Sequence, residues 1–363
     1  MKTFLIAACA AALLIAPCTA AQTAGPAADS GGAPTATDAL DALLDALDFS
    51  GTLLVARGGE VVRREAVNPA SLDAASAVTP QSRFPIASMT KSFTAALVLG
   101  LVDEGQLDLD QTLADLLPDF DVSYSGEVTL RHLLQNRSGI PHYIEIPGWF
   151  DTEVKQAFTE ETFLEALEAL EPKFPPGSDY LYSNVNYYLL ARIVDRHCGM
   201  TYEACLRSRI LDPLGLSETG QIYADPGALA TNYLRDEDGA YEIIPVTNPA
   251  LFRGTASLYA TIDDLGAWGQ AVLDGAVYSD AAEAEAFNAD TPMAWDIGRL
   301  PLGENETVEV VYYNGRLIGY LSLILLLPEQ DGVIVVLNNN TVGYSNMLGI
   351  AGALAAAYFG EPG

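Results

Sequence analysis

A serine and a lysine stand three residues apart, at positions 88 and 91, just before the apolar run AALVLGLV. A serine hydroxyl is a poor nucleophile unless a neighbouring base takes its proton. The mostly apolar residues 88–104 predict a buried helix, and helical residues at i and i+3 share a face, so Lys91 can reach Ser88. Burial would lower the pKa of the lysine and make it a usable base. The helix N-terminus would also place backbone N–H groups near a developing oxyanion.

The alternative is structural: Ser88 caps the helix and Lys91 extends into solvent. The S-x-x-K spacing occurs once in the chain, but by itself it is a weak motif. Other serine systems are not visible, because no G-x-S-x-G elbow is present and the three histidines, at positions 132, 142 and 197, sit in no recognisable triad context.

A second candidate group is Tyr182-Ser183-Asn184, in PPGSDYLYSNVNYYLL. Two other Y-x-N triplets begin at Tyr312 and Tyr344. The first follows a Pro-Pro-Gly turn and precedes a helix, so its side chains can point into a cleft. Tyr312 is expected in a strand and Tyr344 at the start of a terminal helix.

Several ordered segments together resemble the serine β-lactamase and penicillin-binding-protein superfamily, on the branch of class C β-lactamases and D-alanyl-D-alanine carboxypeptidases. The resemblance runs from about Gly51 to Gly360. The segments that carry it are FPIASMTKSFTAALVLGLVDEGQLDLDQTLADLLPDF, LLQNRSGIPHY, PPGSDYLYSNVNYYLLARIVDRHCGMTY, ILDPLGLSETG and RGTASLYATIDDLGAWGQAVLDG. Asn136-Arg137 stand where the family commonly has His-Thr, and the sequence suggests no function for that difference.

The resemblance implies a hydrolase that works through an acyl-enzyme. Ser88 would be the nucleophile and Lys91 its neutral base. Tyr182 would pass a proton between the serine and the leaving group, and Asn184 would hold Lys91 and bind the substrate's amide oxygen. The backbone N–H groups of Ser88 and Arg316 would form the oxyanion hole.

The third motif of the family, Lys-Thr-Gly or His-x-Gly, is replaced here by Tyr313-Asn314-Gly315. Gly315 would leave room for a substrate against the strand. The neutral phenol of Tyr313 can donate a hydrogen bond but cannot pair with a carboxylate as lysine does. The alternative is that Tyr313 is only an aromatic filler in a cleft that no longer recognises this group of the substrate. Strand alternation turns Arg316 to the opposite face. Substrate carboxylates should therefore be recognised poorly, which predicts weak β-lactamase activity against a chromogenic cephalosporin.

Strands are expected at both ends of the chain and helices between them. GTLLVAR and EVVRREAV form a predicted hairpin near the start, and TVEVVYYNG, YLSLILLLP and GVIVVLNNN are three predicted strands near the end, before a closing helix over 343–359. The predicted fold is α+β: a mostly antiparallel sheet formed from both chain ends, flanked by helices, with an inserted all-helical domain. The α/β part covers about 38–105 and 261–360, and the helical part about 106–260.

The N-terminus predicts export. Lys2, the apolar run FLIAACAAALLIAP and the small residues after it are typical of a secretory signal peptide over 1–21. Residues 22–37 read as a disordered linker and 38–360 as the hydrolase domain. The apolar run is too short for a membrane span. Cys18 suggests a lipid anchor, which Pro17 directly before it disfavours. The predicted location is periplasmic or extracellular.

The composition is strongly acidic, with 18 Lys and Arg against 48 Asp and Glu and a net charge of −30. Such a surface repels nucleic acid, and a small-molecule or peptide substrate is the expected partner. No HExxH or paired CxxC is present, so neither a metal site nor a cofactor is predicted. Cys198 and Cys205 can form a disulfide if Gly199 ends one helix and Thr201 begins the next, or they are buried free thiols.

The sequence thus favours an exported serine hydrolase that cleaves ester or amide bonds of D-amino-acid peptide-like substrates. The alternative is a cell-wall peptide- or penicillin-binding protein that turns its ligand over slowly or not at all.

Overall fold

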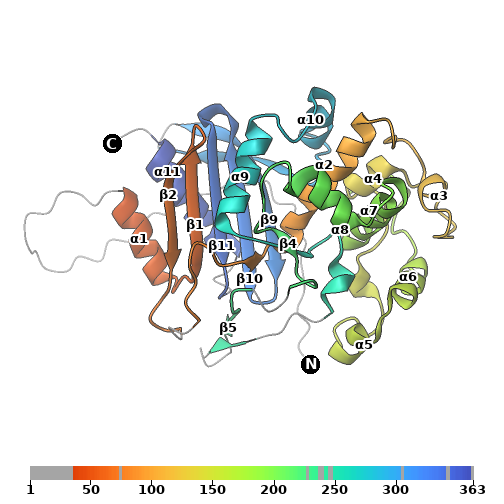
Figure 1. Ribbon diagram of the computed structural model, residues 1–363, viewed down its shortest axis with the longest axis horizontal. Coiled ribbons are helices and arrows are strands. Elements are labelled where there is room, and N and C mark those ends of the chain that lie inside the picture. Colours follow the sequence, from red (N-terminus) through yellow and green to blue (C-terminus); the bar gives the residue numbers. More distant parts are fainter. Residues whose placement is uncertain are drawn as a thin grey trace, which may run out of the picture.

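Both chain ends contribute to one six-stranded sheet (Figure 1). Its order is β2-β1-β11-β10-β9-β8, and every neighbouring pair is antiparallel. The strands are β1 (Gly51–Arg57), β2 (Glu60–Val67), β8 (Asp296–Pro301), β9 (Thr307–Leu317), β10 (Tyr320–Leu327) and β11 (Gly332–Asn338). The predicted α+β class and the sheet built from both ends are confirmed. The edge strand β8 was not predicted, because DIGRLP holds a glycine and a proline and has no apolar run.

The computed structural model describes residues 36–72, 76–225, 229–235, 241–243, 248–303, 306–340 and 344–360. The predicted signal peptide and residues 22–35 of the predicted linker lie outside the described residues. The last two linker residues, Ala36 and Thr37, instead begin helix α1 (Ala36–Ala46).

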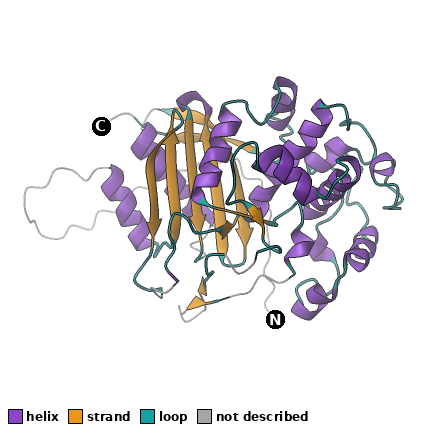
Figure 2. Ribbon diagram, in the orientation of Figure 1, coloured by secondary structure: helices purple, strands orange, loops and turns teal. Residues whose placement is uncertain are grey.

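The central strands bury both faces, and helices cover each of them. Every residue of β10 is buried, with Ile324 and Leu326 in one apolar cluster and Leu323 and Leu325 in the other. Helix α9 (Ile262–Leu273) packs on the first face, and α1 and α11 (Tyr344–Phe359) pack on the second (Figure 2). A Cβ on Gly269 of α9 would lie 2.7 Å from the Val333 side chain, so this glycine allows close contact between helix and sheet.

Most other helices gather on one side of the sheet (Figure 1). They are α2 (Thr90–Asp103), α3 (Leu113–Leu116), α4 (Leu130–Leu134), α5 (Thr152–Ala157), α6 (Glu160–Glu168), α7 (Asn184–His197), α8 (Tyr202–Leu206) and α10 (Asp280–Ala286). Among them α2 contacts α7, α8 and α10. The division of the chain into two domains stays a prediction.

The region expected to be all-helical also contains four short strands, β4 (Gly220–Gln221), β5 (Leu234–Arg235), β6 (Tyr241–Glu242) and β7 (Leu258–Ala260). β7 pairs with both β4 and β3 (Phe84–Pro85), which precedes the candidate nucleophile. These strands are two or three residues long, too short for a periodic sequence signal. Their pairing holds the chain before Ser88 against the segment that ends the insert.

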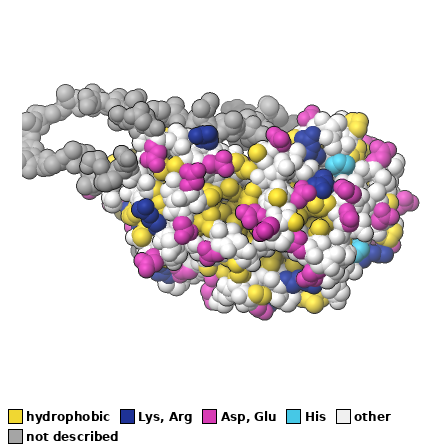
Figure 3. Space-filling model, turned by 90° about the horizontal axis from the view of Figure 1, so that it is seen from above, with side chains coloured by type: hydrophobic (Ala, Val, Ile, Leu, Met, Phe, Trp, Pro, Cys, Tyr) yellow, Lys and Arg dark blue, Asp and Glu magenta, His cyan; other side chains and the backbone are white. Residues whose placement is uncertain are grey.

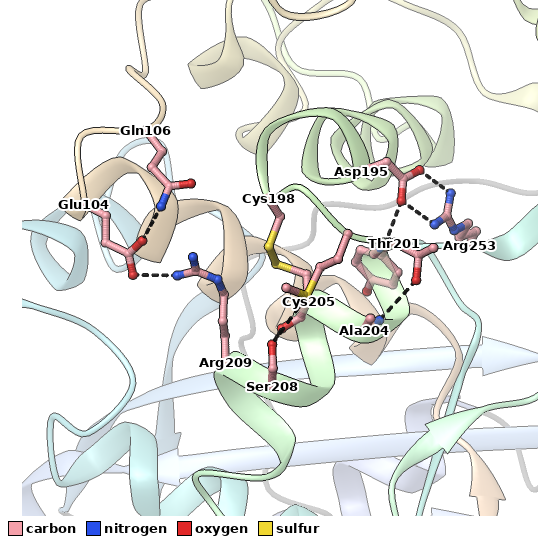
Figure 4. The surroundings of a disulfide bond; sticks show 12 residues. Glu104, Gln106, Asp195, Cys198, Thr201, Ala204, Cys205, Ser208, Arg209 and Arg253 are labelled. Atoms are coloured by element: carbon pink, nitrogen blue, oxygen red, sulfur yellow. Dashed lines mark hydrogen bonds and ion pairs between the residues drawn. A yellow bond between two sulfur atoms is a disulfide. The ribbon is translucent and has the colours of Figure 1, made fainter.

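Cys198 and Cys205 form a disulfide that joins the end of α7 to α8 (Figure 4). Gly199 follows α7 with a left-handed φ of 72°, and the Thr201 side chain caps α8 by accepting a hydrogen bond from the backbone N–H of Ala204. The turn is the one predicted for a disulfide, and the free-thiol alternative is excluded.

Acidic side chains are scattered over the face shown in Figure 3, with few Lys and Arg between them. Among the described residues, no helix is both long and apolar enough to cross a membrane.

Candidate active site

Ser88 lies in a single 3₁₀ turn, η2 (Ala87–Met89), and α2 begins directly after it at Thr90. The backbone of Ala87 is left-handed, with φ 49°, which is a strained conformation for a residue with a Cβ. The Ser322 hydroxyl donates a 2.7 Å hydrogen bond to the carbonyl oxygen of Ile86. The Ser88 side chain caps neither the turn nor the helix, so the capping alternative does not hold.

The Ser88 hydroxyl contacts both predicted partners. Its Oγ lies 2.7 Å from the Tyr182 hydroxyl and 3.3 Å from Lys91 Nζ. Lys91 Nζ also donates a 2.8 Å hydrogen bond to the carbonyl oxygen of Thr255, and it lies 5.0 Å from the centre of the Tyr182 ring. Residues far apart in the sequence therefore meet around one hydroxyl group.

The environment of Lys91 favours its neutral form. Its side chain is 0% exposed, and no carboxylate of the described residues pairs with it. Burial lowers the pKa of Lys91 well below its ordinary value of 10.5. A neutral amine next to a hydroxyl can accept a proton, as the general base of a serine nucleophile must.

Two residues of the LLQNRSG segment hold the loop that carries Tyr182. The backbone carbonyl of Asn136 accepts from the N–H of Leu181, and its side-chain Oδ1 accepts from the N–H of Ser183 at 3.1 Å. Arg137 donates to the carbonyl oxygen of Gly177. The positions to which the sequence assigned no function thus fix the backbone on both sides of Tyr182. Burial raises the pKa of the Tyr182 phenol, so it keeps its proton near neutral pH.

Asn184 is buried beside the site, but its partner differs from the predicted one. Its Nδ2 donates a 2.6 Å hydrogen bond to the Tyr143 hydroxyl, and its Oδ1 is buried without a partner among the described residues. The expected contact between Asn184 and Lys91 is not among these hydrogen bonds. Tyr143 comes from GIPHY, and no sequence signal separated it from the other tyrosines.

His142 also belongs to this region, although the sequence placed it in no motif. Its ring stacks 6.2 Å from that of Tyr182, and its Nδ1 accepts from the N–H of Ile144. Burial, with the nearby charge of Lys91, lowers the pKa of His142 to about 3. His142 is therefore a neutral neighbour of Tyr182 and not a competing base at neutral pH.

The third-motif residues lie on β9 as predicted. Tyr313 is buried, with its ring centre 6.4 Å from that of Trp295, and Arg316 is exposed. Gly315 has a further reason beside the predicted one: a Cβ there would lie 2.1 Å from the carbonyl oxygen of Ile86 and 3.0 Å from the Ala87 side chain. The glycine lets the segment before Ser88 approach the strand, rather than only making room for substrate.

A network of ion pairs supports the backbone that holds Lys91. Arg253, two residues before Thr255, pairs with Asp195 of α7 at 2.5 Å and with Glu203 of α8 at 2.7 Å. In the sequence, Glu203 lies between the two cysteines of the disulfide and Asp195 lies three residues before Cys198, and Figure 4 shows Asp195 and Arg253 near the disulfide. The Thr94 hydroxyl further donates to the carbonyl oxygen of Gly254. These contacts fix the Thr255 carbonyl relative to α2.

Within the described residues, no cluster of three or more His, Cys, Asp or Glu side chains is arranged to hold a metal ion. The groups brought together are a hydroxyl, a neutral amine and a phenol. Together they can take a proton from Ser88 and return it to a leaving group.

Comparisons with known proteins show the family and the fold of the chain. A model of the β-lactamase family matches residues 37–358. Penicillin-binding protein 4* of Bacillus subtilis is 26% identical over 337 residues, which cover 86% of this chain and 73% of that protein. D-aminopeptidase of Brucella ovis is 30% identical over 278 residues, which cover 74% of this chain but only 52% of that protein. The structure of D-amino acid amidase from Ochrobactrum anthropi SV3 superposes with a TM-score of 0.74 at 21% identity, over 88% of this chain and 98% of that one, which shows a shared fold.

Proposed function

This chain belongs to the β-lactamase family of serine hydrolases, and we propose that it cleaves amide or ester bonds through an acyl-enzyme on Ser88. The proposal rests mainly on one observation: the Ser88 hydroxyl contacts two groups that can accept or donate a proton. Ser88 Oγ lies within hydrogen-bond distance of both the Tyr182 phenol and the fully buried amine of Lys91.

In the proposed reaction, Lys91 accepts the proton of Ser88 as Oγ attacks the carbonyl carbon of the substrate. The backbone N–H groups of Ser88 and Arg316 are proposed to stabilise the oxyanion. The proton then passes through Tyr182 to the leaving nitrogen or oxygen, whose bond to the acyl carbon breaks. Water attacks the acyl ester, its proton passes back to the same groups, and Ser88 regains its hydroxyl.

The relatives support amide substrates of the D-amino-acid type. One is named a D-aminopeptidase, and a structural neighbour is named a D-amino acid amidase. The replacement of the family's basic residue by Tyr313 supports poor recognition of substrate carboxylates, and hence weak β-lactamase activity. We also propose export, on the signal-like residues 1–21, with action in the periplasm or outside the cell.

The test combines turnover with detection of the covalent intermediate. A p-nitrophenyl ester and a D-amino acid p-nitroanilide are incubated with wild type, Ser88→Ala and Lys91→Ala, and the intact protein mass is followed. We expect chromophore release and a transient acyl mass only with wild type. Equal slow release from all three proteins would refute the mechanism and favour a binding protein that does not turn its ligand over.

A further inference from the structure

Asp296 stands where the outermost strand of the sheet begins. It is the first residue of β8 and pairs with Tyr312 of β9, directly before the altered third motif at Tyr313. Beyond this pair, Tyr313–Leu317 continue beside β10, and none of the described strands pairs with their other edge. An extended substrate can pair with such an open edge, and Asp296 then lies at one end of the substrate.

The carboxylate of Asp296 has no partner within the part of the chain that the structure describes. It is only partly exposed, yet it forms no ion pair or hydrogen bond with any other described residue. A carboxylate withdrawn from water is normally paired with a cation, so an unpaired one beside an open strand edge indicates a missing positive group. Burial raises the pKa of Asp296 to about 6, which still leaves it mainly ionised at neutral pH.

The charge of the same carboxylate affects the pKa values of tyrosines that would surround the leaving group. Burial is the main cause that raises the pKa values of Tyr180, Tyr182 and Tyr313, and the charge of Asp296 adds to each shift. Asp296 therefore lies within electrostatic range of the phenol that contacts Ser88 and of the residue that replaces the family's lysine or histidine.

The direction along β9 separates the two ends of this open edge. The position opposite Asp296 is four residues before Arg316, a separation of about 13 Å along a strand. Arg316 marks the end where the substrate's carbonyl oxygen would lie, and Tyr182 marks the atom that leaves. Asp296 stands opposite Tyr312, at the end of this open edge away from Arg316, so we assign it to the leaving-group end.

We propose that Asp296 forms a subsite for a positively charged leaving group, so that the enzyme prefers amides or esters whose released amine, alcohol or thiol carries a cation. The same charge disfavours leaving groups that end in a carboxylate. This inference rests on the proposed function, because it names which substrates the Ser88 site cleaves best.

Three thioesters with one short acyl chain test the charge preference directly. The leaving thiols are thiocholine (cationic), its neutral isostere 3,3-dimethylbutanethiol and 3-mercaptopropanoate (anionic), and release is followed with a thiol-reactive chromogen. For wild type, we expect kcat/KM to fall in that order. In Asp296→Asn, we expect the ratio of cationic to neutral kcat/KM to fall about tenfold or more, and the ratio of anionic to neutral to rise.

Glu309→Gln is the matched control, because Glu309 is an exposed acid on β9 and its loss changes the net charge equally. It should leave both ratios as in wild type. Ratios unchanged in Asp296→Asn, or changed to the same extent in Glu309→Gln, would overturn the proposal. A preference for substrates with an ammonium group on the acyl side, instead of on the leaving group, would also overturn the proposal.

The two proposals fail in different ways. If thiol release does not require Ser88, the proposed function fails. If release requires Ser88 but ignores the leaving-group charge, only the subsite is wrong. A readout without turnover uses ketone analogues in which CH₂ replaces the thioester sulfur, with affinity measured by calorimetry. Tighter binding of the cationic analogue to wild type than to Asp296→Asn is expected, and equal binding overturns the subsite even if no thioester is cleaved.

Discussion

Lys91 Nζ lies 2.8 Å from the carbonyl oxygen of Thr255 and 3.3 Å from Ser88 Oγ, so the backbone carbonyl holds the amine that faces the nucleophile. A neutral amine has two N–H donors and one lone pair. When one N–H is donated to a fixed carbonyl, the lone pair can turn toward the serine proton. The Arg253 ion pairs that fix this carbonyl therefore position the base, although they lie outside the reacting groups.

Replacing Lys91 by methionine should make the protein more stable and inactive. In the folded state the lowered pKa of Lys91 means that fewer protons are bound than in the unfolded chain. The free energy of unfolding must therefore rise with pH between the lowered pKa and about 10.5, and at neutral pH the buried lysine is destabilising. We expect Lys91→Met to gain about 1–3 kcal/mol in thermal or urea unfolding, with loss of turnover. A less stable variant would contradict this description of the site.

The pH dependence of turnover should reveal the lowered pKa of Lys91. Lys91 acts as a base only when neutral, so kcat/KM should rise with pH through its pKa and reach its plateau well below pH 10.5. Other titratable groups lie near Tyr182, which contacts Ser88. Burial keeps Tyr182 protonated, and His142 titrates only near pH 3. Asp296 titrates near pH 6, so the profile is recorded with a neutral substrate, in wild type and in Asp296→Asn. A fall in kcat/KM at low pH that is seen in both proteins is due to protonation of Lys91. A fall that is lost in Asp296→Asn is due to Asp296.

Sequence patterns predicted the elements that have a local hydrophobic or spacing signal. They missed the features that depend on contacts between residues far apart in the sequence. The apolar runs that form β10 and β11 were visible, as was the S-x-x-K pair, since spacing along one helix is local information. β8 was missed because DIGRLP has no periodic signal. The partner of Asn184 and the roles of Asn136 and Asp296 depend on loops and edges brought together by tertiary packing, which no local pattern encodes.

Gly315→Ala should damage the nucleophile segment even though the residue takes no part in proton transfer. The added Cβ would lie 2.1 Å from the Ile86 carbonyl oxygen, so the strand and the turn before Ser88 must separate. We expect a loss of about 1–3 kcal/mol of unfolding free energy, and a fall in ester turnover of at least tenfold at temperatures where the variant is folded. Gly126→Ala is the control, because no atom lies within 4 Å of its added Cβ. Equal behaviour of the two variants would show that the close approach is not required.

The disulfide should contribute stability rather than chemistry. Cys198 and Cys205 are seven residues apart, and a crosslink that closes so short a loop is expected to stabilise by about 2–3 kcal/mol. The double variant Cys198→Ser, Cys205→Ser should unfold at lower temperature, and a reductant should lower the stability of wild type to the same level. Ester turnover below the unfolding transition should be kept in the double variant. Loss of turnover in the folded double variant would instead indicate that the disulfide, through Asp195 and Arg253, is needed to hold Lys91 in place.

Tyr313→Lys tests whether the altered third motif explains weak recognition of carboxylates. Wild type should hydrolyse a chromogenic cephalosporin with kcat/KM below about 10⁴ M⁻¹s⁻¹. The new ammonium group would stand at the position of the family's basic residue and could pair with a substrate carboxylate, so kcat/KM for the cephalosporin should rise about tenfold. Asp296 lies within electrostatic range of position 313 and would compete for the lysine.

The double variant Tyr313→Lys, Asp296→Asn should therefore exceed the single one, and its gain over the product of the two single effects measures their coupling. Turnover of a neutral ester serves as the reference for folding and for the Ser88 chemistry. A cephalosporin activity that is already high in wild type, or that rises in neither variant, would mean that another group sets the carboxylate preference. In that case the loss of the family's basic residue would not explain the substrate range.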